Sequence, residues 1–96
     1  MKSSTERSIT TAIRKYLKSL PGLWYYKTHG GPFESQVGCP DILCCYGGMF
    51  YGFEVKQEGR YPTKVQKRQL ELIVSAGGKA GVVRSVDDVK EIMDIE

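Results

Sequence analysis

Two apolar runs separated by a pair of glycines constrain the fold of this chain most. Residues 42–46 and 49–55 are rich in aliphatic and aromatic side chains, and the glycine pair 47–48 lies between them. Two such runs joined by a two-residue glycine turn are typical of an antiparallel β-hairpin. If the residues that flank the glycines pair with each other, the same register places Asp41 directly opposite Glu54.

The predicted hairpin brings two carboxylates and an amine together. Opposed residues have Cβ atoms about 5 Å apart, and side chains alternate between faces, so Lys56 shares a face with Glu54. Like charges set opposite each other destabilise a sheet, whereas Mg²⁺ and Mn²⁺ prefer oxygen ligands and lower the pKa of a bound water. Asp41, Glu54 and Lys56 therefore indicate a divalent-metal site. The alternative is an ordinary surface acid pair beside a lysine.

The residues around this pair resemble a known nuclease family. Pro40-Asp41 followed by Glu54-x-Lys56 is similar to the signature of the PD-(D/E)XK superfamily, and the surroundings are similar to its VRR-NUC branch. The further matching positions are Glu6, Gly38, Ile42, Leu43, Phe53, Val55, Thr63, Gln66, Gly77, Gly78, Val83, Arg84 and Ser85. The resemblance implies an α/β fold, a restriction endonuclease-like α/β/α sandwich with a central mixed β-sheet, over residues 1–96 as a single domain.

The same resemblance implies a function and partners. It implies a metal-dependent DNA endonuclease that hydrolyses phosphodiester bonds, is selective for branched or four-way-junction (Holliday junction) DNA, and acts in replication, recombination or repair. Stand-alone members are similar to dimeric junction resolvases, which implies a homodimer. Two other readings stay open, namely a catalytically silent DNA-binding module of this fold and a dimerisation or interaction domain that binds no divalent metal.

The predicted hairpin geometry and the family resemblance together indicate the site residues. Asp41 and Glu54, with Glu6 and the Val55 carbonyl, are expected to hold one or two Mg²⁺ or Mn²⁺ ions, while Lys56 prepares water for attack on the phosphate. Gln66 matches the family's glutamine position and is a further catalytic candidate.

Helix capping is the alternative explanation for two of these residues. Ser3-x-x-Glu6 and Thr63-x-x-Gln66 each fit a capping box. Glu6 precedes Ile9 by three positions, so its spacing also predicts a core-facing acid that needs a partner.

Basic residues gather in the middle of the chain, although the net charge is only +3. Such a region beside carboxylates suits a polyanion, and a solvated helix face is the alternative. The sole histidine borders a glycine-rich loop, where it could touch phosphate or simply be solvated. The candidate DNA-binding residues are Lys27, His29, Arg60, Lys64, Lys67 and Arg68.

The order of elements predicts an α/β sandwich with a mixed sheet. Helical spacing of apolar residues precedes Pro21-Gly22, and strands follow at 23–28, 42–46 and 49–55. A second helix is expected from Thr63 to the glycines at 77–78, then a strand at 80–84 and a last helix capped by Ser85.

Several classes of protein are disfavoured. No apolar run approaches about 18 residues and the N-terminus is polar, so we expect no membrane association and a cytosolic location in a bacterial cell or phage-infected host. Cys39, Cys44 and Cys45 lie close together with no second Cys/His cluster, and we expect reduced core thiols. No glycine pattern fits a nucleotide cofactor. The aromatic segment 24–26 is expected in the core or a dimer contact, with base stacking as the alternative.

Overall fold

The computed structural model describes residues 4–28 and 37–95. Its elements follow the predicted order of helix, three strands, helix, strand and helix. They are α1 (Glu6–Lys18), β1 (Trp24–Lys27), β2 (Ile42–Tyr46), β3 (Met49–Val55), α2 (Lys64–Ser75), β4 (Lys79–Val83) and α3 (Val86–Met93).

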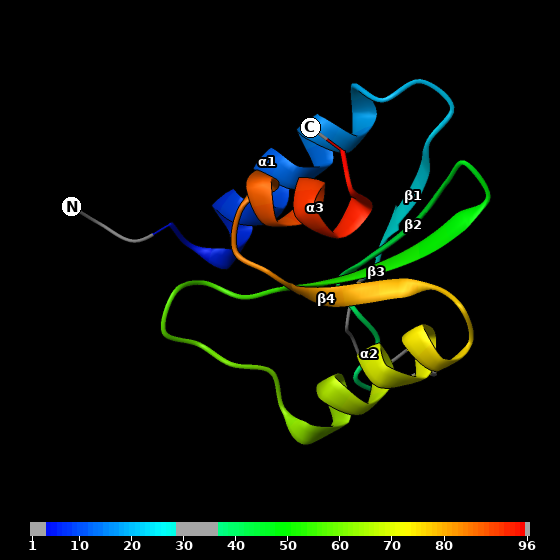
Figure 1. Ribbon diagram of the computed structural model, residues 1–96. Coiled ribbons are helices and arrows are strands. Elements are labelled where there is room, and N and C mark those ends of the chain that lie inside the picture. Colours follow the sequence, from blue (N-terminus) through cyan, green and yellow to red (C-terminus); the bar gives the residue numbers. More distant parts are fainter. Residues whose placement is uncertain (1–3, 29–36, 96) are drawn as a thin grey trace.

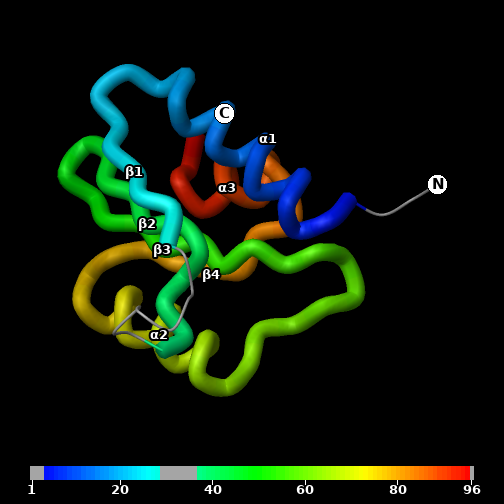
Figure 2. Tube along the Cα trace, turned by 180° about the vertical axis from the view of Figure 1, so that it is seen from behind, coloured from blue at the N-terminus to red at the C-terminus, as the bar shows by residue number. Residues whose placement is uncertain are grey.

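The four strands form one mixed sheet in the order β1-β2-β3-β4. The pairings β1–β2 and β2–β3 are antiparallel, whereas β3 and β4 run parallel. Helices α1 and α3 cover one face and α2 lies on the other, as Figures 1 and 2 show from opposite sides. The structure therefore has the α/β/α sandwich with a central mixed sheet that the sequence predicted.

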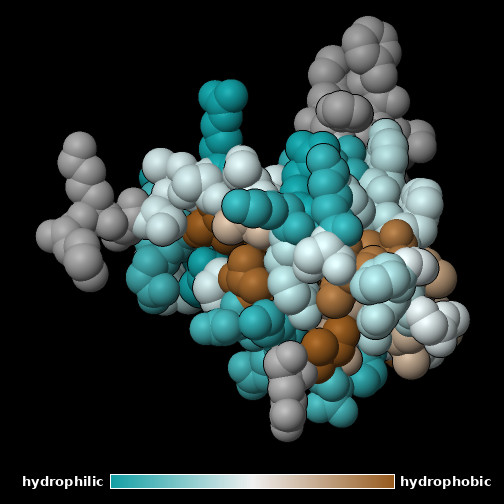
Figure 3. All heavy atoms as spheres, turned by 90° about the horizontal axis from the view of Figure 1, so that it is seen from above, coloured by the Kyte–Doolittle hydropathy of each residue, from teal (hydrophilic) through white to brown (hydrophobic). Residues whose placement is uncertain are grey.

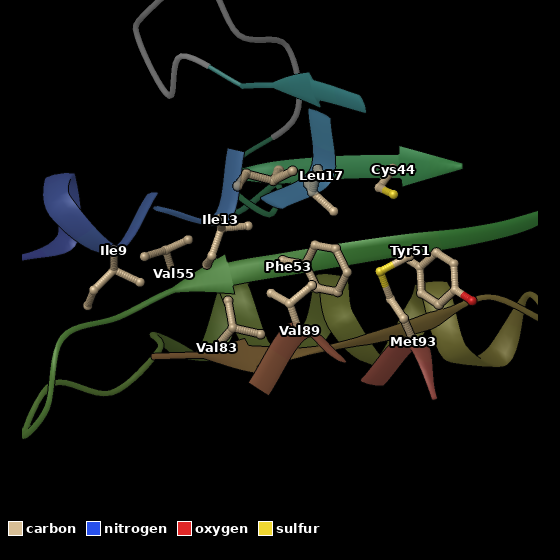
Figure 4. Close-up of a cluster of buried hydrophobic side chains, with 11 residues drawn as sticks. Ile9, Ile13, Leu17, Cys44, Tyr51, Phe53, Val55, Val83, Val89 and Met93 are labelled. Atoms are coloured by element: carbon tan, nitrogen blue, oxygen red, sulfur yellow. The ribbon is translucent and has the colours of Figure 1, made fainter. Parts of the chain in front are cut away.

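The main apolar core lies between the sheet and the pair α1 and α3. Ile9, Ile13 and Leu17 recur every four residues along α1, so they form one buried stripe. Alternate residues of β3 meet this stripe, with Phe53 at the centre (Figure 4). The other core members are Ile42, Cys44, Tyr51, Val55, Val83, Val89 and Met93.

Close contacts with α2 fix the segment that leads into β2. A Cβ atom on Gly52 would lie 2.6 Å from Ile73 Cδ1, so the missing side chain lets α2 approach the sheet. Gly38 has φ +80°, and a Cβ there would lie 2.6 Å from Val65 Cγ1. Only glycine adopts that conformation at this distance without strain, so the chain preceding Pro40 can rest on the first turn of α2.

Two of the three predicted helix caps are confirmed. Thr63 caps α2 through a full capping box, and Ser85 caps α3. The cap of α1 was predicted wrongly, because Thr5 takes that position and its side chain accepts from the Ser8 amide at 3.1 Å. None of the helices in the described ranges is long and apolar enough to cross a membrane.

The cysteines differ from one another in burial. All three are free thiols, but only Cys44 is fully buried, and Cys45 is exposed. The expectation of core thiols was therefore wrong for Cys45, which points to the sheet face opposite Cys44 because strand side chains alternate. Burial raises the pKa of Cys44 to about 11, so this thiol stays protonated at neutral pH.

Candidate functional site

The β2–β3 hairpin has the register that the sequence predicted. Tyr46 pairs with Met49 and Ile42 with Phe53, so Asp41 and Glu54 occupy the next opposed positions at the open end of the hairpin. The Val55 amide donates to Asp41 Oδ2 at 2.8 Å. This hydrogen bond ties the Asp41 carboxylate to the end of β3, beside Glu54.

Glu54 is a buried acid, with only 2% of its surface exposed. Its Oε1 atom accepts no hydrogen bond within the described part of the chain, and Oε2 lies 3.7 Å from Lys56 Nζ. Burial, the charge of Asp41 and the side-chain hydrogen bond to Asp41 raise the pKa of Glu54 to about 8, while Lys56 opposes the shift. A buried carboxylate with an unpaired oxygen is costly, and a cation would stabilise its charged form.

Thr28, which no sequence pattern marks as a site residue, holds the backbone of the Pro40-Asp41 pair. Its hydroxyl donates to the Pro40 carbonyl at 2.9 Å and to the Asp41 carbonyl at 3.2 Å. Its amide also donates to the Asp41 carbonyl at 2.9 Å, and the side chain is buried. Thr28 therefore positions Asp41 from the neighbouring strand.

A cavity of about 450 Å³ opens between α1 and the Asp41 end of the sheet. Besides Asp41, it is lined by Glu6, Arg7, Thr10, Thr11, Arg14 and Lys27. Arg7 and Arg14 were not predicted as site residues, although their separation of seven positions puts them on one face of a helix. Arg14 also lies over the Tyr25 ring, 5.9 Å from its centroid. Three cationic side chains thus border one of the two site carboxylates.

The segment after Lys56 is held by Arg84. The Lys56 amide donates to the Val83 carbonyl at 3.1 Å, which extends the β3–β4 ladder by one bond. Arg84 Nη1 donates to the carbonyls of Gln57 at 3.1 Å and Arg60 at 3.0 Å. Its guanidinium also lies 5.3 Å from the centroid of the Tyr61 ring. Arg84 thereby restrains the loop that leaves the site.

The other candidate site residues, Glu6, Val55 and Gln66, differ in how they are placed. Glu6 is exposed on the cavity wall, so its predicted core-facing position was wrong. The reason is geometric, because the buried stripe of α1 begins at Ile9 and Glu6 lies in the first turn beyond it. No group of three His, Cys, Asp or Glu side chains is arranged to hold a metal ion within residues 4–28 and 37–95. The Val55 side chain faces the apolar core, and Gln66 Oε1 accepts from the Thr63 amide at 2.8 Å.

The candidate DNA-binding residues fall into two groups. Lys27 borders the cavity with Asp41. Arg60, Lys64, Lys67 and Arg68 are exposed in the segment from the loop after Lys56 into α2, and Arg68 lies 3.7 Å from Glu71. His29 lies outside the described residues. Figure 3, viewed onto the layer of α1 and α3, shows a mainly hydrophilic face with small apolar areas.

Comparison with solved structures identifies the architecture. One structure, named "VRR_NUC domain protein", matches with a TM-score of 0.77 and 21% sequence identity, covering 97% of this chain and 88% of that chain. The chain has the VRR_NUC fold. A second structure, named "VRR_NUC domain", matches with a TM-score of 0.74 and 24% identity, covering 95% of this chain and 97% of that chain. No family model matches the sequence, and no curated protein matches it. Within this VRR_NUC fold, Asp41, Glu54 and Lys56 lie together where the hairpin opens.

Proposed function

We propose that this chain is a metal-dependent DNA endonuclease that hydrolyses phosphodiester bonds at the open end of the β2–β3 hairpin. The observation that carries the proposal is the buried Glu54 carboxylate, which faces Asp41 and lies 3.7 Å from Lys56, and one of its oxygens has no hydrogen-bond donor among the described residues. Such an arrangement is costly for folding, and a divalent cation would turn it into a binding site. The shared VRR_NUC fold supports the same assignment.

The donor set suits Mg²⁺ or Mn²⁺. Asp41 and Glu54 offer hard carboxylate oxygens, and the Val55 carbonyl and the Glu6 carboxylate are the proposed additional ligands. The bound cation would supply an activated water and stabilise negative charge on the phosphate. The chain contributes by fixing Asp41 through Thr28 and the Val55 amide, and by excluding solvent around Glu54.

Lys56 and the surrounding cations are proposed to handle the DNA. The Lys56 side chain is 14% exposed, and its ammonium group lies 3.7 Å from Glu54 Oε2. A cation at this position would offset charge that develops on the attacked phosphate. Arg7, Arg14 and Lys27 would contact backbone phosphates on the α1 side of Asp41. Arg60, Lys64, Lys67, Arg68 and His29 are the proposed further DNA contacts, and Gln66 is a proposed catalytic contact.

A homodimer is the proposed assembly, with branched or four-way-junction DNA as the preferred substrate. Trp24 pairs with Cys45, and Cys45 pairs with Phe50, so these three exposed residues form one row across the sheet. Trp24 is 56% exposed, and Tyr26 beside the row is 44% exposed. An exposed aromatic patch of this kind is typical of a protein interface. Two sites related by two-fold symmetry would suit paired incision of a branched substrate.

A cleavage assay tests the proposed activity. The protein is incubated with Mg²⁺ or Mn²⁺ and a panel of duplex, flap, single-stranded and four-way-junction DNAs. We expect cleavage that requires the metal and is greatest on the branched substrates. Asp41→Asn keeps the side-chain shape but removes the charged ligand, so its cleavage should be undetectable, whereas Asp87→Asn on the exposed start of α3 should cleave normally. No cleavage of any substrate by the wild type, or full activity of Asp41→Asn, would refute the proposal.

The dimer is tested separately by light scattering at micromolar concentration. We expect twice the chain mass for the wild type and the chain mass for Trp24→Glu, which places a charge in the aromatic row. Lys79→Glu, which changes an exposed residue at the far edge strand, is the control and should remain dimeric. If the wild type has the mass of one chain both with and without DNA, the paired-incision model is refuted. The proposal then reduces to a nuclease that cuts a single strand.

A further inference from the structure

Strand β4 presents an open edge of the sheet. Among the described residues its neighbouring strand is β3, so its other side has no partner strand. The Val83 carbonyl accepts from the Lys56 amide, which shows that the backbone groups of Val83 point toward β3. Backbone direction alternates along a strand, so the amides and carbonyls of Ala80 and Val82 point outward to the free edge.

This edge carries few of the features that prevent strand addition. Proteins usually protect an edge with proline, central charges or a bulge. The sequence of β4 is Lys-Ala-Gly-Val-Val, in which the only charge stands at the first residue. Figure 1 shows β4 on the near side of the molecule, running between α3 and α2. The edge is therefore apolar and flanked by two helices, and its central residues Ala80, Gly81 and Val82 are half-buried.

Two grooves of different chemistry border this edge. The groove on the α2 side has a volume of about 520 Å³, and Leu70 and Val74 form the apolar part of its helix wall, beside Lys67, Glu71 and Ser75. The groove on the α3 side has a volume of about 480 Å³, and its helix wall contains Ile92, the exposed Glu91, and Asp88, whose Oδ2 accepts from the Arg84 amide at 2.8 Å. Ala80, Gly81 and Val82 of β4 line both grooves.

We propose that β4 is a docking edge for an extended segment of another protein, in which apolar and basic residues alternate. Such a segment would add to the sheet beside β4 by backbone hydrogen bonds to Ala80 and Val82. Successive side chains of a strand point to opposite faces. One set would therefore enter the groove beside α2, and the other would meet the Glu91 carboxylate beside α3.

Charge decides between this occupant and two others. DNA is disfavoured because the α3 side of the edge is acidic, whereas the cations that suit phosphate surround Asp41 and the start of α2. If two copies paired through β4, the Glu91 carboxylates of both copies would lie at the same interface, where like charges repel. A basic partner segment complements the groove, and its docking does not depend on the proposed nuclease activity.

Fluorescence anisotropy with labelled peptides of about eight residues, a typical strand length, tests the proposal. The probe alternates Lys and Val, a second peptide alternates Glu and Val, and a third contains the residues of the first in two blocks. We expect saturable binding of the alternating Lys-Val peptide alone. Equal binding of the block peptide or of the Glu-Val peptide would overturn the proposal, and so would an absence of binding.

Variants separate backbone pairing from charge. Ala80→Pro removes an outward amide and should weaken binding at least about tenfold, whereas Ala80→Ser keeps the amide and should bind normally. Glu91→Lys should weaken binding of the Lys-Val peptide at least about threefold and gain binding of the Glu-Val peptide. Asp87→Lys makes the same charge change outside the groove. It should neither weaken binding of the Lys-Val peptide nor gain binding of the Glu-Val peptide.

If circular dichroism shows that Ala80→Pro is unfolded, the Glu91→Lys comparison tests the proposal by itself. Unchanged peptide preference in Glu91→Lys would then refute the docking edge. Self-association of the wild type that Glu91→Gln strengthens, by removing the repelling charge from both copies, would assign the edge to a second copy and would refute the proposal equally.

Discussion

Phe53 and Glu54 are neighbours on β3 with nearly equal burial but opposite energetic roles. Phe53 is fully buried, and its ring stacks 6.0 Å from that of Tyr51 within the apolar core. Glu54 is 2% exposed on the opposite face and meets the charge of Asp41. Burial stabilises the first side chain and penalises the charged form of the second. The comparison shows that one strand can serve folding on one face and chemistry on the other.

The largest effect is expected on the folding face. Phe53→Ala should lower the free energy of unfolding by about 3–5 kcal/mol, because it removes a central ring and leaves a cavity. That is a large part of the roughly 5–15 kcal/mol typical of a domain. Urea denaturation followed by circular dichroism measures the change. Phe50→Ala, at an exposed position of the same strand, should cost much less, and equal costs would contradict this description of the core.

The chemical face should lose activity without losing the fold. Lys56→Ala removes the ammonium group 3.7 Å from Glu54 but no core volume, so cleavage should fall at least about 100-fold. Thermal unfolding should change little. Lys79→Ala removes an exposed lysine at the other end of the β3–β4 ladder and should cleave normally. A fully active Lys56→Ala protein would show that this lysine has no part in the reaction.

A smaller effect tests how Asp41 is positioned. Thr28→Val keeps the side-chain shape but removes the hydroxyl that donates to the Pro40 and Asp41 carbonyls. The free energy of unfolding should therefore fall by about 1 kcal/mol. Thr11→Val removes an exposed hydroxyl that donates to the Arg7 carbonyl and should cost less. Mn²⁺ affinity should fall in Thr28→Val and stay constant in Thr11→Val. The same affinity in both variants would argue against a positioning role.

The burial of Glu54 is tested by the pH dependence of stability in the presence of EDTA. Folding raises the pKa of Glu54 from 4.5 to about 8, so between these values the folded protein binds a proton that the unfolded chain has released. The free energy of unfolding should therefore fall as pH rises from about 4.5 to about 8. Glu54→Gln lacks this proton, so the wild type should lose stability relative to the variant over that range. If the stability difference between the wild type and Glu54→Gln did not change with pH, burial would not raise the pKa of Glu54.

The hairpin was predictable because its signals are local. Gly47 and Gly48 both have positive φ, 60° and 82°, as a two-residue turn of the favoured type requires. Such a turn fixes one register, and the opposition of Asp41 and Glu54 follows from it. The capping box at Thr63 and Gln66 was predictable for the same reason, because it involves residues three positions apart.

The rest of the site depends on contacts that sequence distance hides. Thr28 reaches Pro40 and Asp41 across the β1–β2 pairing, and no local pattern distinguishes it from any other threonine. Arg7 lines the same cavity as Asp41, although 34 positions separate them in the sequence. Glu6 was misplaced because its spacing from Ile9 fits the buried stripe of α1, whereas that stripe begins at Ile9 and Glu6 is exposed in the first turn.

Calorimetric titration with Mn²⁺ tests the central claim, that the paired carboxylates form a cation site, most directly. The wild type should bind Mn²⁺ with millimolar or tighter affinity, on the order of 4 kcal/mol or more. Asp41→Asn should bind none, while circular dichroism shows an intact fold. Asp87→Asn, which removes an exposed carboxylate from α3, should bind like the wild type. Equal Mn²⁺ affinity in Asp41→Asn and the wild type would contradict the assignment of this site.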